Sequence, residues 1–478
     1  MNAKKKVVLF ILGGGAVALV LAVVVFALTF DINSYRPRIE AAASVATGLE
    51  VRINGKMGLS FFPFGVSAKD IHVANKGGEI ISLENLKLGA ELMPLLKKQL
   101  KVTSCELVKP AVTIVKDADG KYNFESAERK STEGVAGAAF GVKEFKLSKG
   151  VMVYIDRKTG EKTEFKDFNL AIKDLSIGDT AADIIKNFSF TGSFDCNEVR
   201  KKDLKIDNVK SPIKAEKGVI YLTPLTMDIF GAKGEGDATI DKSEVDTLYK
   251  INLKVSKLDF EKLEQSFGIK KVIGGKGDFF AALTMKEKGS RRLMSSLDGT
   301  FSLRGDNLVI YIMDLDKVLS KYETSQEFNL VDLGAFFIAG PLSTFAVRGY
   351  RSGDLYNQTR GGQGAITHFN SHWKIKNGVA DATDCALATH HNRVALKGKL
   401  NLVSERYDNV IVALLDDKGC AKFKQSISGS FRKPQISAVS AAESLAGPFS
   451  SLYRKAKRFV QGGQCEVIYN GSVQQPPK

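Results

Sequence analysis

The stretch "VRINGKMGLSFFPFGVSAKDIHVAN" (Val51–Asn75) sets the pattern of the whole chain. Apolar and polar residues alternate through it, which is typical of a strand with one buried face and one wet face. An aromatic break, Phe61-Phe62-Pro63-Phe64-Gly65, interrupts it, and we expect Pro63 to end strand pairing there. The same alternation returns in residues 81–92, 112–124, 151–172, 188–194, 221–240, 251–255, 301–303 and 394–402. We therefore predict a mainly β chain with a long, curved, mostly antiparallel sheet.

The composition supports a folded protein built from strands and turns. The 478 residues are 44% hydrophobic and 26% charged, which is not the balance of a disordered chain. With 44 glycines and one tryptophan, strands and turns are favoured over a helical bundle. The net charge of +16 suits either nucleic acid or anionic lipid as a partner.

The N-terminus decides between these two partners. Lys4, Lys5 and Lys6 precede Val7–Phe30, a run of 24 residues without a charge. A helix of that length spans about 36 Å, enough to cross a hydrocarbon core of about 30 Å. We predict an uncleaved anchor with its lysines in the cytoplasm and residues 31–478 on the far side, with a cleaved signal peptide as the alternative. Export in either form disfavours nucleic acid as a partner.

Helical signals are few along the exported part. Short helices are predicted within 91–101, 259–267 and 314–322. The clearest helix is Phe449–Val460, with aromatic and aliphatic residues on one face and four basic residues on the other. It either caps the last strand edge or lies on an anionic membrane. The predicted regions are 1–30 (lysines and anchor), 31–125, 126–364 and 365–440 (β regions), and 441–478 (amphipathic helix and tail).

No pattern for catalysis or metal binding is present in the sequence. His368 and His372 are four residues apart, but they lie in a predicted strand, where that spacing separates them by about 13 Å. None of the five cysteines forms a CxxC motif, which argues against zinc. In an oxidising compartment we expect one C-terminal disulfide, with Cys420 and Cys465 as the candidates. We expect neither enzymatic activity nor a cofactor.

Several motifs occur in a characteristic order. They are Phe30-Asp-Ile-Asn-Ser-Tyr-Arg-Pro37, Ala46-Thr-Gly48, Gly55-Lys-Met-Gly-Leu-Ser-Phe-Phe-Pro63 and Gly65-Val-Ser-Ala-Lys-Asp-Ile71, followed much later by Trp373-Lys-Ile-Lys-Asn-Gly378, Asp384-Cys-Ala-Leu387, Asn392–Leu400 and Ile427–Pro434. In this order they resemble the AsmA family of Gram-negative inner-membrane proteins, over residues 1–115 and 365–440. The middle of the chain agrees only in its alternation.

The resemblance implies a single-pass inner-membrane protein with its C-terminal body in the periplasm. It further implies a sheet that curls into a hydrophobic groove, related to bridge-like lipid-transfer proteins. Roles in envelope lipid homeostasis and outer-membrane assembly would follow, with phospholipid and other envelope proteins as partners.

An apolar sheet face suits this role on physical grounds. Removing a phospholipid from a bilayer exposes about 30 methylenes, at a cost of about 25 kcal/mol. The expected lipid-contact residues are Phe61, Phe62, Phe64, Leu88 and Leu396. The alternative is that the aromatic residues fill an ordinary core. A second function also stays open, a scaffold whose sheet edges bind unfolded outer-membrane strands, and an enzyme is a distant third.

Overall fold

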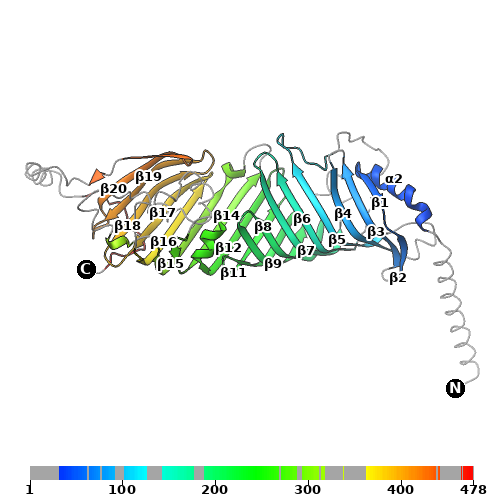
Figure 1. The fold of residues 1–478 in the computed structure, drawn as a ribbon, viewed down its shortest axis with the longest axis horizontal. Helices are drawn as coiled ribbons and strands as arrows, with labels where there is room; N and C mark the ends of the chain where they lie inside the picture. The colour runs from blue at the N-terminus through cyan, green and yellow to red at the C-terminus, as the bar shows by residue number, and fades with distance from the viewer. Residues whose placement is uncertain are drawn as a thin grey trace, which may run out of the picture. The chain divides into compact units, whose positions relative to one another are not determined.

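The structure, a computed structural model, is mainly β and carries few short helices (Figure 1). It describes residues 32–61, 64–75, 78–91, 102–125, 143–176, 188–267, 271–287, 293–311, 314–317, 337, 362–437, 440–441, 465 and 467–476. The 22 strands belong to one sheet, and all but one of the described strand pairs are antiparallel. The prediction of a mainly β chain with a long, mostly antiparallel sheet is therefore confirmed.

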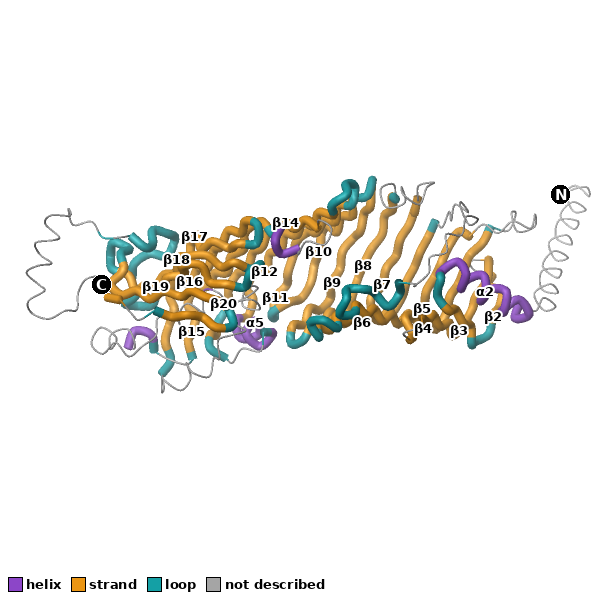
Figure 2. Tube along the Cα trace, turned by 90° about the horizontal axis from the view of Figure 1, so that it is seen from above, coloured by secondary structure: helices purple, strands orange, loops and turns teal. Residues whose placement is uncertain are grey.

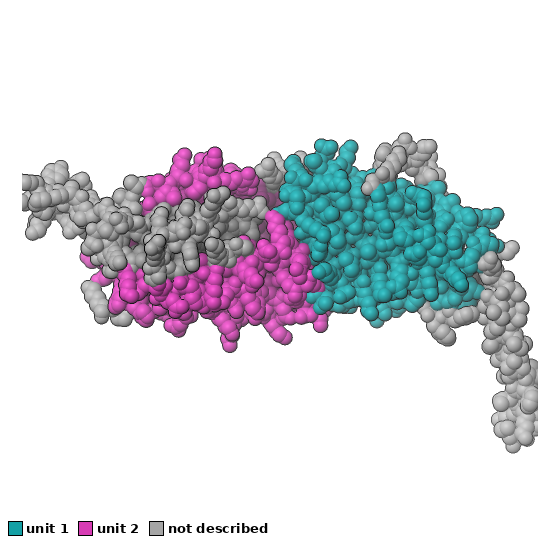
Figure 3. Space-filling view, in the orientation of Figure 1, with its two compact units in different colours: residues 1–197 teal, residues 198–478 magenta. Residues whose placement is uncertain are grey.

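The chain divides into two compact units (Figure 3). Unit 1 comprises Met1–Asn197 and unit 2 comprises Glu198–Lys478. The boundary falls inside strand β8 (Ser189–Lys201), within the region 126–364 that the sequence analysis treats as one middle part.

The described part of unit 1 begins with two helical elements, and its other described elements are strands. The helical elements are η1 (Ile32–Tyr35) and α2 (Arg36–Thr47). The strands are β1 (Glu50–Ile53), β2 (Met57–Phe61), β3 (Phe64–Asn75), β4 (Gly78–Ala90), β5 (Val102–Lys116), β6 (Glu144–Asp156), β7 (Glu161–Ser176) and the first part of β8. Helix α2 has a proline in its first turn and ends at Gly48, whose φ of 69° is the left-handed value that glycine adopts without strain.

Strand order in unit 1 follows the chain. Strands β1 and β2 both pair antiparallel with β3, and β3, β4 and β5 pair in succession. Strands β5 and β6 are parallel, and β6 and β7 form a hairpin. At the aromatic break β2 ends at Phe61, which pairs with Phe64 at the start of β3, so the two strands form a hairpin; Pro63 itself lies outside the described residues.

Unit 2 contains the remaining elements. They are β9 (Leu204–Glu216), β10 (Val219–Ile229), β11 (Ala232–Asp241), β12 (Thr247–Asp259), α5 (Phe260–Ser266), β13 (Ile273–Gly274), β14 (Lys276–Glu287), η2 (Leu293–Ser296), β15 (Asp298–Ile310), β16 (Gly364–Lys376), β17 (Val379–Ala388), β18 (Arg393–Asn401), β19 (Arg406–Leu415), β20 (Ala421–Ser430), β21 (Lys433–Ile436) and β22 (Ser440–Ala441). The helix predicted at 259–267 is α5, and the Asp259 carboxylate caps it by accepting the N–H groups of Glu261 and Lys262.

Several predicted helices fall wholly or largely outside the described residues. Among the described residues, no helix is long and apolar enough to cross a membrane. The predicted anchor Val7–Phe30 and the predicted helix Phe449–Val460 lie outside the described residues. Within 314–322 the described helical residues are Leu315, Asp316 and Lys317.

Candidate functional site

The strand register of unit 1 aligns apolar side chains in rows across one face of the sheet. Residues directly opposite one another in neighbouring strands share a face. One row consists of Leu59, Val66, Leu88, Cys105, Phe145 and Ile172, and a second consists of Met57, Ala68, Leu86, Leu107, Leu147 and Leu170. Six successive strands, β2 to β7, thus contribute to the same apolar face, which we call the unit 1 apolar face.

The other side of the same strands is polar. Between the apolar positions lies a row made of Ser67, Lys87, Glu106, Lys146 and Ala171. The Lys87 ammonium and the Glu106 carboxylate in this row form an ion pair at 3.1 Å. Water solvates this side, so the unit 1 apolar face is the side that needs a partner.

The unit 1 apolar face is only partly covered by protein. Leu86, Leu88, Leu107 and Phe145 are half-buried. Leu147 is among the better covered members, at 8% exposed. A sheet face in a closed core would be buried more completely, as the equivalent residues in unit 2 are.

A line of left-handed residues keeps this face continuous. Asp70, Lys109, Lys149 and Asp167 have φ values of 53°, 49°, 54° and 51°, and each lies inside a strand. From β3 to β6 each such residue has no partner in the register, and the residue beside it in the neighbouring strand is skipped as well. The register is therefore the same on both sides of this line, while the alternation along each strand shifts by one. As a result, Ile71 lies in the same apolar cluster as Ala68, three residues earlier.

The interior of unit 2 is closed by protein. Leu396 is 2% exposed and Trp373 is 0% exposed, and both belong to its large buried cluster. The ring of Phe337, also 0% exposed, stacks on that of Phe369 with their centroids 5.8 Å apart. The Phe337 carbonyl accepts hydrogen bonds from Ser371 Oγ at 2.5 Å and from the Trp373 indole N–H at 3.3 Å. Phe337 thus fills the interior beside β16.

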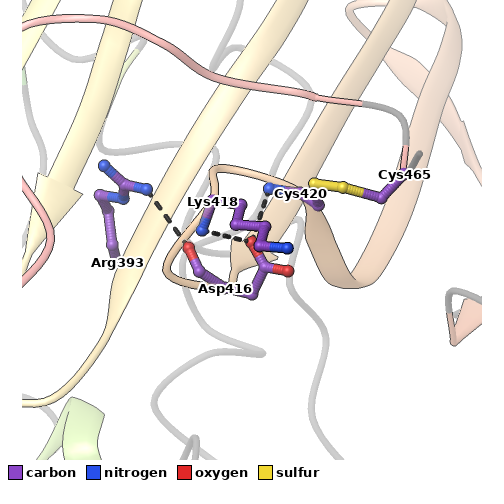
Figure 4. The surroundings of a disulfide bond; sticks show 5 residues. All are labelled: Arg393, Asp416, Lys418, Cys420 and Cys465. Carbon is purple, nitrogen blue, oxygen red and sulfur yellow. Dashed lines mark hydrogen bonds between the residues drawn. A yellow bond between two sulfur atoms is a disulfide. The ribbon is translucent and has the colours of Figure 1, made fainter. Parts of the chain in front are cut away.

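The C-terminal residues cover the other side of strands β17 to β19. A second buried cluster joins Ala386, Ala388, Ala395, Ala413 and Leu415 of these strands to Ile468, Tyr469 and Val473. The small alanine side chains leave room for the larger tail residues. A disulfide joins Cys420, the residue before β20, to Cys465 at the start of this tail (Figure 4). This is the pair that the sequence analysis names.

Polar contacts fix the tail in place. The Tyr469 hydroxyl donates to the Asp384 carboxylate, and burial raises the pKa of Tyr469. Arg393, 7% exposed, donates to the Val473 carbonyl at 3.1 Å and to the Asp416 carbonyl at 3.3 Å (Figure 4 shows the latter). The tail is therefore an integral part of unit 2.

Helix α2 and the preceding η1 close the edge of the sheet in unit 1. Their side chains bond the outward backbone groups of β1, β2 and the turn between them: Ser44 Oγ accepts from the Val51 N–H at 2.9 Å, Glu40 Oε1 from the Ile53 N–H at 2.6 Å, Asn33 Oδ1 from the Met57 N–H at 2.9 Å, and Arg36 donates to the Gly55 carbonyl at 2.8 Å. The backbone groups bonded in this way, between Val51 and Met57, cannot also pair with another strand. Figure 1 shows α2 beside β1, and Figure 2 shows it near β2.

The described residues offer no arrangement for metal binding. Their one group of close potential ligands is Asp416, Cys420 and Cys465, and its two cysteines are joined in the disulfide. His368 lies in β16, as expected, and its Nδ1 is 2.8 Å from the Asp306 carboxylate.

One buried carboxyl group has a clearly structural position. Burial raises the pKa of Glu264 in α5 to about 7. Its two oxygens accept the backbone N–H groups of Val272 and Ile273 at 2.9 and 3.0 Å. Glu264 therefore ties α5 to the segment that leads into β13.

The predicted lipid-contact residues fall in different surroundings. Leu88 is half-buried in the first row of the unit 1 apolar face, and Phe64 is half-buried at the start of β3. Phe61 ends β2, and Phe62 lies outside the described residues. Leu396, in contrast, packs against protein in the core of unit 2. The sequence analysis did not anticipate helix α2 or the packing of the tail.

Comparison with known proteins gives a family. A model described as the AsmA family matches the chain twice, at residues 1–195 and 179–385. The matches include the middle of the chain, where the sequence analysis saw only alternation, and they end at 385, before most of the C-terminal motifs. The first match ends close to the boundary between the two units. No curated protein and no solved structure matches the chain.

Proposed function

Since the chain belongs to the AsmA family, we propose that it holds or conducts phospholipid between the inner and outer membrane. In this role it contributes to outer-membrane assembly and to lipid homeostasis. Residues 7–30 anchor it in the inner membrane, and the rest of the chain lies in the periplasm. It acts by binding and performs no chemical reaction.

The observation that carries this proposal is the unit 1 apolar face. Its rows are continuous over six strands, yet most of their side chains are only half-buried. An acyl chain lying on such a row replaces water with apolar contact, at a gain of about 0.8 kcal/mol for each methylene that it buries. The charged opposite side of the sheet keeps the same strands soluble.

The rows are long enough for an acyl chain. Five steps between neighbouring strands, at about 4.8 Å each, give a row about 24 Å long. One leaflet of a bilayer has a hydrocarbon thickness of about 15 Å, half of the full core. A chain that fits within a leaflet can therefore lie along a row of unit 1.

The test places a charge on each side of the sheet. We expect Leu88→Asp to lower the phospholipid that co-purifies with the full chain by more than tenfold at the affected site, because a carboxylate against acyl chains costs several kcal/mol. The matched control is Val108→Asp, since Val108 pairs with Asn85 on the polar side of the neighbouring strand. Native mass spectrometry measures the lipid, and circular dichroism measures folding.

Two results would contradict the proposal. One is an unchanged lipid content in a folded Leu88→Asp variant. The other is an equal loss of lipid in both variants, because the face of the sheet would then make no difference.

The scaffold function is less well supported by the geometry. It needs free strand edges, and between Val51 and Met57 the edge formed by β1 and β2 is covered by the side chains of η1 and α2. Binding of a barrel-strand peptide by delipidated protein, with no lipid in the purified protein, would favour the scaffold instead.

A further inference from the structure

The polarity of helix α2 is the reverse of what a surface helix on a soluble protein shows. Its inward side is polar, with Arg36, Glu40 and Ser44 turned to the strand edge. Its outward side carries large apolar side chains, Ile39 at 37% exposed and Val45 at 67% exposed, and Tyr35 just before the helix is 43% exposed. An ordinary surface helix turns its apolar side inward and its polar side to water.

The outward side is also free of negative charge. Among the exposed described residues of α2, the one charged side chain is the cation of Arg38. The acidic residue of the helix, Glu40, is turned inward, where it accepts the Ile53 N–H. The outward side therefore combines apolar groups, an aromatic ring and a positive charge, which is the composition of a helix face at a membrane interface.

The residues that precede helix α2 in the sequence indicate which partner lies close to it. One residue, Asp31, separates the end of the uncharged run Val7–Phe30 from η1, which begins at Ile32. Even a fully extended chain covers at most about 18 Å over the five steps from Phe30 to Tyr35. The interfacial layer adds about 5 to 8 Å beyond the hydrocarbon on each side of a bilayer. The short connection from Phe30 to Tyr35 thus holds the start of helix α2 next to the interfacial layer.

We propose that the outward side of α2, formed by Tyr35, Arg38, Ile39 and Val45, lies in the interface of the lipid bilayer that Val7–Phe30 enters. Its inward side meanwhile closes the sheet edge. The helix then joins the membrane surface to the first strands of the sheet. The inference rests on the membrane anchorage in the proposed function and is independent of lipid binding to the sheet.

The single native tryptophan makes the test direct. Trp373 is 0% exposed in the core of unit 2 and gives a constant background. We would make Ile39→Trp and Val45→Trp in the full chain and reconstitute each into phosphatidylcholine and phosphatidylglycerol vesicles, with and without brominated acyl chains. Both introduced tryptophans should emit less light in brominated vesicles than in unbrominated ones. In vesicles their emission maximum should also lie at a shorter wavelength than it does in detergent-free water.

The matched control is Val245→Trp, because Val245 is an equally simple apolar side chain, 95% exposed, in unit 2. Its emission should be the same in both kinds of vesicle. Circular dichroism measures whether each variant is folded. Two helix positions are tested so that the experiment still has a readout if one of the two variants does not fold.

Three outcomes separate the claims. Bromine quenching at positions 39 and 45 but not at 245 supports the inference. Vesicle flotation of the protein without quenching at 39 and 45 overturns the inference and leaves the anchor intact. Failure to float with vesicles at all overturns both the anchor and the interfacial helix, whatever lipid the sheet carries.

Discussion

Replacing Asn33 with alanine should open the closed edge of the sheet at Met57. The Asn33 amide acts there like a neighbouring strand. Its oxygen accepts the Met57 N–H at 2.9 Å, and its nitrogen donates to the Met57 carbonyl at 3.3 Å. The same oxygen also accepts from Arg36 at 3.1 Å, which positions the arginine for its bond to the Gly55 carbonyl. Asn33→Ala removes these three contacts.

The size of the effect follows from the hydrogen bonds. A typical hydrogen bond contributes about 0.5 to 1.5 kcal/mol net, so two bonds to Met57 give about 1 to 3 kcal/mol of local stability. Since every 1.4 kcal/mol is a factor of ten, the amides of β1 and β2 should exchange with solvent roughly 5 to 150 times faster. Asn33→Asp should fall between wild type and alanine, because aspartate keeps the acceptor and loses the donor.

Hydrogen exchange read by mass spectrometry on peptides covering residues 50–61 measures this directly. Arg38→Ala is the control, because Arg38 lies on the exposed side of α2, the helix that follows η1. The reasoning would be refuted by unchanged exchange in Asn33→Ala, or by an equal acceleration in Arg38→Ala. Either result would mean that the Asn33 amide of η1 does not hold the edge at Met57.

Three further predictions concern unit 2. Burial raises the pKa of Glu264 to about 7 from its usual 4.5, so between these pH values unfolding releases a proton. Calorimetry should therefore show that unit 2 loses about 2 to 3 kcal/mol of stability as the pH rises from about 4.5 to 7.5. The Glu264→Gln variant should lack this pH dependence. Cys465→Ser should lower the stability of unit 2 by about 2 to 4 kcal/mol in thermal melts under oxidising conditions, and unchanged melting would mean that the tail holds without the disulfide. Leu396→Asp should unfold unit 2, seen as loss of the near-ultraviolet signal of Trp373, whereas a folded Leu396→Asp protein would show that this position is not core.

The strands were predictable because their signal is local. The alternation in Val51–Asn75 corresponds to β1, β2 and β3, and the aspartate before residues 260–266 marks the start of α5. Both signals depend only on residues near one another in the sequence. Local chemistry of this kind decides the type of an element before any tertiary contact is known.

Burial could not be predicted in the same way. Leu88 and Leu396 occupy equivalent apolar positions in alternating segments, yet one is half-buried and the other is 2% exposed. The difference comes from residues distant in the sequence, such as Phe337, which occupies the interior of unit 2. Alternation shows that a side chain faces the apolar side of a sheet, but not what lies over that side.

Helix α2 escaped prediction for a physical reason. A search for amphipathic helices expects an apolar stripe turned to the protein, and this helix turns Arg36, Glu40 and Ser44 inward instead. The remaining signals were Pro37 in the first turn and Gly48 just after the end. These mark the boundaries of a helix but say nothing about its partner.

The closed edge beside β1 and β2 also bears on the order in which the protein assembles. N-terminal segments are made first, so β2, β3 and the helical cover are available to one another before β4 is. From β3 to β7 each new strand pairs with the one made just before it. With one edge blocked from the outset, the nascent sheet has a single growing end, and two unfinished chains can meet only through those ends. Blocking one edge of the sheet in this way makes folding of unit 1 a stepwise addition of strands in one direction. It also halves the number of sheet edges through which incomplete molecules could join.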